Sequence, residues 1–150
     1  MDDVGGFSHG QLMLALVACE RHRAALDARQ TRIIAALSAE RVAAHEKQHV
    51  RDEVASVLRL SPSVHGRFEL AEGLARLPET MAALEDGEIS VEHARVLTES
   101  LVGLDDETAA LLEAAVLPYA CTHDVYDTRR KAGRDPRKID PLSAEQRLEQ

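Results

Sequence analysis

Apolar residues recur along the first third of the chain with the spacing of one helix face. No glycine or proline interrupts the stretch from Gln11 to Leu60, and Ser8 stands just before it as a good helix N-cap. The recurrent positions, spaced by four, three, seven, seven and four residues, are Leu12, Leu16, Cys19, Leu26, Ile33 and Leu37. This pattern predicts one long amphipathic helix from Ser8 to about Ala44, roughly 55 Å in length.

A helix of this length needs a partner for its apolar face. We expect it to pack against other helices of the same chain in an antiparallel bundle, with Cys19 as a buried apolar residue. The alternative is a coiled-coil-like arm that pairs with a helix of another molecule.

The rest of the chain divides into shorter helices that begin at capping residues and end near glycine or proline. The predicted helices are Arg51–Arg59, one capped by Ser61 with Pro62 in its first turn, one from Pro78 to Asp86 that stops at Gly87, one from Ser90 to near Gly103, one from Asp105 to just before Pro118, one from Asp124 to Lys131, and one opened by Ser143. Gly133 to Pro141 is expected to be a basic loop. The period of two that is typical of strands is missing from the sequence, which therefore predicts an all-α fold.

Length and composition predict a single helical domain over residues 1–150. It comprises the long helix (8–50), a helix-turn-helix with the helices that follow it (51–117) and a basic C-terminal segment (118–150), and we expect the domain to be incomplete at its C-terminus. Apolar residues make up 45% of the chain but aromatic residues only 3%, so the core must consist of small aliphatic side chains.

The net charge of −8 is unevenly distributed. Residues 79–117 contain ten acidic residues and one arginine, whereas residues 129–138 contain six basic residues and one acidic residue. The overall charge argues against a non-specific nucleic-acid binder, but the basic cluster leaves room for a local contact with phosphate groups. The acidic side chains of 79–117 are expected to face solvent or a basic partner.

Two cysteines and an acidic, polar N-terminus without a basic leader predict a reduced, cytoplasmic protein. The apolar run from Leu12 to Cys19 is too short to cross a bilayer, so no membrane partner is expected. Cys121 is expected just past a helix end.

Residues 45–49 read HEKQH, which matches the H-E-x-x-H string of zinc metalloproteases. In such an enzyme His45 and His49 bind zinc and Glu46 is the general base. The residue after the glutamate is usually apolar, because that helix lies under a buried cleft, but here it is Lys47. A downstream motif for the third ligand is also missing. We therefore reject this metal site and keep the protease as a remote alternative. We interpret the string as a polar helix end or a joint between helices, with two exposed histidines.

The segment from Asp52 to Leu74 matches the pattern of a helix-turn-helix, E-V-A-x-x-L-x-L-S followed by a second helix. Ala55 is small where the two helices cross, and Arg59 occupies the turn position at which glycine is usual. The positions expected to face a shared core are Val54, Leu58, Leu60, Val64, Phe68 and Ala71.

If Pro62 to Leu74 is a recognition helix, its outward residues meet the major groove while the basic cluster contacts phosphates. The outward positions are Ser63, His65, Gly66 and Arg67. The candidate DNA-binding residues are Ser63, His65, Arg67, Arg129, Arg130, Lys131, Arg134, Arg137 and Lys138. The alternative is a helical hairpin kept only for packing, since residues 51–76 carry as many acidic residues as arginines.

Residues 53–97 resemble the central helix-turn-helix region of ParB-type partition proteins. The resemblance lies in the E-V-A-x-x-L-x-L-S pattern, in a Leu-Pro-Glu, and in a G-x-I-S-x-x-H-A-R run that comprises Gly87, Ile89, Ser90, His93, Ala94 and Arg95. It implies that this region binds DNA, but not partition itself, because the nucleotide-binding motifs of that family are missing from the sequence. His93 is expected to be a packing or capping residue and not a catalytic base.

A second resemblance covers nearly the whole chain. The runs LMLALVACERHRAALDARQ, LRLSPSVHGRFELAEGLARLPETMAALEDGEISVEHARVL, GLDDETAALLEAAVLP and RKAGRDPRKIDP resemble domain of unknown function 222, from a repeat family linked to mobile loci. Complete members of that family continue into an HNH endonuclease domain. The sequence contains no asparagine, which an HNH metal site requires, so the resemblance implies the helical module without the nuclease.

The sequence thus predicts a non-catalytic helical module without a cofactor. Its leading predicted function is binding of double-stranded DNA, as an accessory part of the HNH-endonuclease-associated family. The alternative is protein–protein interaction, in which the long N-terminal helix forms a homodimer or docks a partner helix.

Overall fold

The computed structural model describes residues 4–40, 47–59 and 64–133, and these residues form helices without any strand. The all-α fold predicted from the sequence is therefore confirmed. In chain order the elements are the 3-10 helix η1 (Val4–Gly6) and the α-helices α1 (His9–Glu40), α2 (Lys47–Leu58), α3 (Val64–Ala75), α4 (Pro78–Glu85), α5 (Val91–Glu99), α6 (Asp106–Ala120) and α7 (Val125–Ala132). Within the described residues, no helix is both long and apolar enough to cross a membrane.

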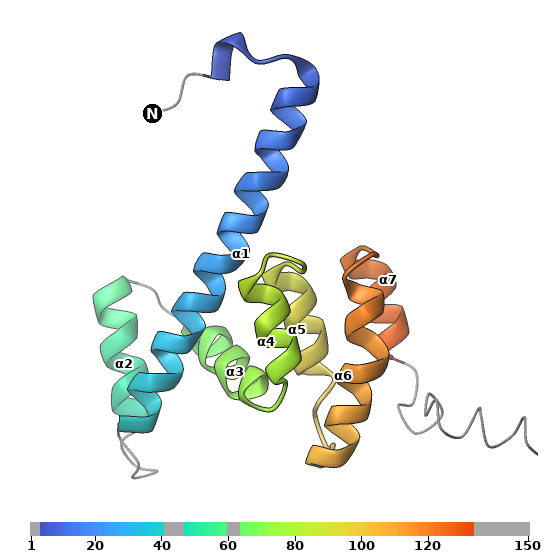
Figure 1. Ribbon diagram of the computed structural model, residues 1–150. Coiled ribbons are helices and arrows are strands. Elements are labelled where there is room, and N and C mark those ends of the chain that lie inside the picture. Colours follow the sequence, from blue (N-terminus) through green and yellow to red (C-terminus); the bar gives the residue numbers. More distant parts are fainter. Residues whose placement is uncertain (1–3, 41–46, 60–63, 134–150) are drawn as a thin grey trace, which may run out of the picture.

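Helix α1 is the long helix that the apolar spacing predicts, with 32 residues and a length of about 48 Å. Ser8 and Gln11 cap its start reciprocally: the Ser8 N–H donates to Gln11 Oε1 at 2.8 Å and the Gln11 N–H donates to Ser8 Oγ at 3.3 Å. Residues 41–44, which the prediction includes, lie outside the described ranges. Figure 1 shows the C-terminal half of α1 packed beside α2, α3 and α4, while its first turns extend beyond the other helices.

Small side chains attach α1 to the bundle. Ala24, Ala28, Thr31 and Ile34 are its buried residues. Alanine and threonine allow the backbone of α1 to approach α3 and α4 closely. The face of α1 that packs on the bundle is therefore this one, although it is less apolar than the face that the sequence predicts to be buried.

Helices α3 to α7 and the middle of α1 enclose the main core. Its largest fully buried side chains are aliphatic: Leu74, Leu77, Leu84, Leu97 and Leu112. Completely buried alanines fill the spaces between them, as the low aromatic content predicts.

Most helix boundaries fall where the sequence places them. Asp105 and Asp124 accept hydrogen bonds from the backbone N–H groups of Thr108 and Asp127, both at 2.8 Å. Gly87 follows α4 with a φ of 72°, a conformation that favours glycine. The predicted end of α6 before Pro118 is wrong, because α6 continues to Ala120.

The continuation of α6 has a tertiary cause. Ala120, beyond the proline, is buried in the main core, and the Cys121 N–H still donates to the Leu117 carbonyl at 3.1 Å. Packing on the core therefore outweighs the loss of one hydrogen bond at Pro118.

The start of α4 is capped by a residue from another helix. Leu77 precedes α4 and offers no side-chain cap, but the Glu113 carboxylate of α6 lies at this helix end. It accepts hydrogen bonds from the Thr80 N–H at 3.1 Å, from the Thr80 hydroxyl at 2.8 Å and from the Glu79 N–H at 3.4 Å. Glu113 is only 6% exposed, so the expectation that the acidic residues of 79–117 face solvent is wrong for this residue.

Candidate functional site

Helices α2 and α3 form the helix pair that the helix-turn-helix pattern predicts. Their shared core contains Val50, Val64, Phe68 and Ala71 together with Ile34 of α1, and Val54 and Ala55 pack against it. The expectation that both helices face one core is therefore confirmed, except that Leu58 is 40% exposed and Leu60 lies outside the described residues. Arg59 has a φ of 53°, in the left-handed region that favours glycine at this turn.

The exposed face of α3 is acidic. It presents His65, Glu69 and Glu72 to solvent. Arg51 of α2 donates to Glu72 Oε1 at 3.4 Å, and its guanidinium also lies 5.4 Å from the centre of the Phe68 ring. Carboxylates on this face repel the phosphates of a duplex, so α3 is poorly suited to enter a major groove.

The residues expected to point outward from the start of α3 diverge. His65 is exposed, but Arg67 turns toward α1 and donates to Gln30 Oε1 at 2.6 Å. Gly66 faces α5, where a Cβ would lie 3.2 Å from Arg95 Nη1. Ser63 lies outside the described residues. The structure therefore does not bring the three described positions to one outward face.

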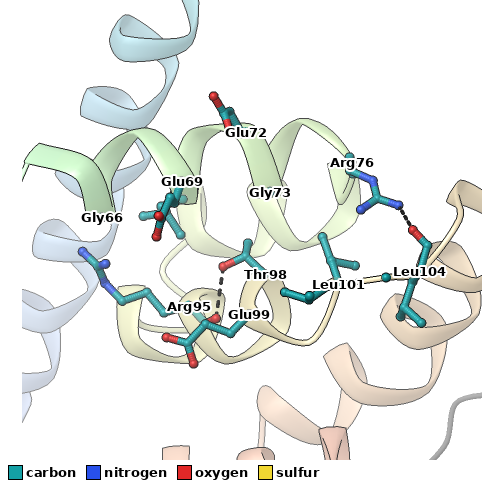
Figure 2. Close-up of a pocket in the computed structure, with 13 residues that line it drawn as sticks. Gly66, Glu69, Glu72, Gly73, Arg76, Arg95, Thr98, Glu99, Leu101 and Leu104 are labelled. Atoms are coloured by element: carbon teal, nitrogen blue, oxygen red, sulfur yellow. Dashed lines mark hydrogen bonds between the residues drawn. The ribbon is translucent and has the colours of Figure 1, made fainter. Parts of the chain in front are cut away.

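A cleft of about 560 Å³ lies between α3 and α5. Figure 2 shows the glutamates and arginines that line it, with Arg76 directed toward Leu104. Arg76 donates to the Leu104 carbonyl at 2.6 Å and to Asp106 Oδ1 at 3.1 Å. Charges of both signs compensate each other here, and the lining residues place no nucleophile beside a general base.

Within the lining of this cleft, α3 and α5 touch at a glycine. A Cβ on Gly73 would lie 2.6 Å from Cβ and Cγ2 of Thr98, closer than two carbon atoms can approach. Figure 2 shows Gly73 directly above Thr98. The crossing of these two helices thus requires glycine at this position.

The described part of the basic cluster lies at the end of α7. Arg129 pairs with Glu99 at 3.1 Å, the Arg130 guanidinium lies 5.9 Å from the Tyr126 ring centre, and the Lys131 ammonium lies 5.5 Å from the Tyr119 ring centre. Arg134, Arg137 and Lys138 lie outside the described residues. Helix α5 contacts both α3 and α7, and these two helices lie on different sides of it (Figure 1).

Of the HEKQH string, His49 is exposed in the first turn of α2. His45 and Glu46 lie outside the described residues. Within the described ranges, no group of three or more histidine, cysteine, aspartate or glutamate side chains is arranged to hold a metal ion.

His93 has a capping role, as expected. Its Nδ1 lies 3.3 Å from the Ser90 N–H, while the His93 N–H donates to Ser90 Oγ at 3.3 Å, which completes a capping box at the start of α5. Its Nε2 lies 2.9 Å from the His123 carbonyl oxygen, so both ring nitrogens are engaged in structural contacts.

Two titratable groups are shifted by their surroundings. Partial burial, and then the nearby charge of Glu92, raises the pKa of Asp27 above its ordinary value, while Arg23, Arg67 and Arg95 oppose the rise. Burial, and then Glu88, raises the pKa of the Cys121 thiol. Cys121 lies just past the end of α6, as predicted. A raised pKa lowers the thiolate fraction of Cys121 at neutral pH and makes it a poor nucleophile.

The apolar face of α1 is exposed. We call Leu12, Leu16, Cys19, Leu26, Ile33 and Leu37 the apolar seam. None of these six residues is buried: Leu26 is 65% exposed and Ile33 53%. The prediction that Cys19 is buried, and that this face packs within the bundle, is therefore wrong, because α1 docks through its alanines instead.

At its C-terminal end the apolar seam forms one wall of a groove. Ile33 and Leu37 face Val54, Val57 and Leu58 of α2 across an open space of about 450 Å³. Val57 is 78% exposed. The sequence pattern does not reveal this groove, because its two walls come from different helices.

The comparisons with known proteins identify a family but no activity for this chain. The family model described as "Domain of unknown function (DUF222)" matches residues 14–117. No curated protein and no solved structure matches this chain.

Proposed function

Because the chain belongs to the family described as domain of unknown function 222, a description that names no activity, we propose its function from the surfaces that its helices expose. It is a non-catalytic helical module that binds a partner helix along α1. The observation that carries this proposal is the apolar seam, which runs for 26 residues along one side of α1 and is exposed throughout. Exposed apolar stripes of this length are rare on proteins that act alone and mark interaction sites.

The position of α1 supports the same function. Its first turns extend beyond the other helices (Figure 1), and the side chains of the apolar seam are exposed along it. Helix-in-groove recognition uses anchors with this spacing. The DNA-binding alternative through α3 has weaker support, since the exposed face of α3 is acidic and Arg67 is bonded to Gln30.

Cross-linking tests this proposal. A photoreactive amino acid in place of Leu12, on the apolar seam, should give protein adducts when the full chain is made in its own host cell. The same substitution at Leu14, which is 72% exposed but on the other side of α1, is the matched control. Equal adduct yields from the two positions, or none from Leu12, would contradict the proposal.

A second candidate, contact with DNA, is supported by one observation: three cations end α7, and further arginines and one lysine follow in the sequence. We expect Arg130→Ala with Lys131→Ala to weaken binding of every duplex alike and to reduce the slope of log K against log salt by roughly one to two units. Fluorescence titration with labelled duplexes at two salt concentrations measures both effects.

Arg67→Ala is the control for this titration, because its guanidinium already bonds Gln30 and should contribute little to binding. If Arg67→Ala instead lowers the binding free energy by about 1–3 kcal/mol, and only for one preferred sequence, α3 contacts base edges directly. If no duplex binds more tightly than about 10⁻⁴ M, the weak end of non-specific binding, the DNA candidate fails.

A further inference from the structure

Two exposed apolar surfaces lie at opposite ends of α1 and on the same side of it. At the N-terminal end, Leu12 is 41% exposed and Leu16 57% exposed, and the first turns of α1 extend beyond the other helices (Figure 1). At the C-terminal end, Ile33 and Leu37 line the groove of about 450 Å³ against α2. One surface is an exposed helix end and the other is a groove, so a single chain carries both halves of a helix–groove contact.

The spacing of the apolar seam provides a register in which the whole seam of one chain is paired with that of a second copy. Spacings of three, four and seven residues are those of the core positions of a coiled coil, and Arg23 and Gln30 fill the two positions of that repeat that are not apolar. In an antiparallel pair with Leu12 opposite Leu37 of the second copy, Leu16 falls opposite Ile33. Cys19 then falls opposite Gln30, and Arg23 opposite Leu26. One register fits all four pairs.

We propose that the partner of the apolar seam is a second copy of this chain, held antiparallel in this register; this proposal rests on the proposed function. The contact is two-fold symmetric, so the projecting end of each α1 fills the groove of the other chain. Helices α1 and α2 of both copies then form a four-helix bundle. A parallel pair would bring both α2 helices to one end and leave the two projecting ends in contact only with each other.

The size of the contact suits a stable dimer. A standard interface involves about 20–30 residues on each side. The seam, the positions that flank it between Leu12 and Leu37, and the groove wall formed by α2 provide about that number. Arg23 and Gln30 fall near the middle of the contact, where isolated polar residues specify register at some cost in affinity.

Disulfide cross-linking tests the register. Two variants are prepared in a background that carries Cys19→Ser and Cys121→Ser. One variant also carries Leu12→Cys and the other Leu37→Cys, and the two are mixed. After mild oxidation, the mixture should give a disulfide-linked dimer of one chain of each kind, because a disulfide needs Cα atoms within about 7 Å. Leu14→Cys mixed with Leu37→Cys should give none. Efficient cross-linking of Leu12→Cys with itself would indicate a parallel pair and overturn the proposal.

Sedimentation velocity tests the second copy itself. The full chain should be a dimer, and Leu12→Glu should raise its dissociation constant about 100-fold or more, since each dimer contains two such side chains facing an apolar groove. Leu14→Glu should leave the constant unchanged. Circular dichroism of both variants should match that of the parent, because neither residue is buried.

A chain that stays monomeric up to about 10⁻⁴ M overturns the dimer, because a specific interface of this size should associate well below that concentration. If such a monomer still gives adducts to another protein from position 12, the proposed function stands and only the second copy is excluded. Adducts formed solely within one chain would exclude both the dimer and the proposed function.

Discussion

Replacing Glu113 with alanine is expected to lower the free energy of unfolding by about 3 kcal/mol. The substitution removes the acceptor for the backbone N–H and the hydroxyl of Thr80, a residue with no exposed surface, and leaves the first turn of α4 without a cap. Glu113→Gln keeps one acceptor oxygen and should cost roughly half as much.

Urea unfolding at constant pH measures the loss. Glu107, exposed on the same helix α6, is the matched control, and its replacement by alanine should change stability by no more than about 0.5 kcal/mol. Equal losses at the two positions would mean that the carboxylate of Glu113 does not cap α4.

Replacing Gly73 with leucine is expected to lower the free energy of unfolding by about 3 kcal/mol or more, because the new side chain enters the space occupied by Thr98 and forces α3 away from α5. Gly73→Ala should already be destabilising, by about 1–2 kcal/mol, although alanine is the better helix former. Thermal and urea unfolding both report this loss.

Gly66 provides the control on the same helix. A Cβ there meets only the end of the Arg95 side chain, which can move aside, so Gly66→Ala should be neutral or stabilising by up to about 1 kcal/mol. Of the two alanine substitutions, only Gly73→Ala should therefore destabilise the protein. A stabilising Gly73→Ala would show that the contact between α3 and α5 is looser than described.

Local signals in the sequence predict the helices well. Ser8, Ser90, Asp105 and Asp124 each cap the helix that follows, and Gly87 ends α4, because capping and left-handed turns depend on residues within one turn of one another. Arg59, at the turn position where glycine is usual, adopts a left-handed conformation with a φ of 53°.

The sequence does not reveal contacts between segments that are far apart along the chain. The cap on α4 comes from Glu113, more than 30 positions away, and Arg67 turns inward because Gln30 of another helix accepts its hydrogen bond. The apolar spacing of α1 predicts a stripe but not what covers it. Ala24 and Ala28 dock α1 because they allow close approach, a property that a pattern of large apolar residues does not report.

The uninterrupted backbone of α1 also makes this helix a spacer of fixed length and phase. From Gln11 to Glu40 it contains no glycine or proline, the residues at which helices bend most readily, so its tip keeps a constant direction relative to the bundle. One residue inserted before Ala24 would advance the tip by about 1.5 Å and turn it by roughly 100°, whereas seven would restore nearly the original orientation. Length changes in this helix are thus tolerated in steps of whole heptads, and related chains that share its binding geometry should differ there by multiples of seven residues.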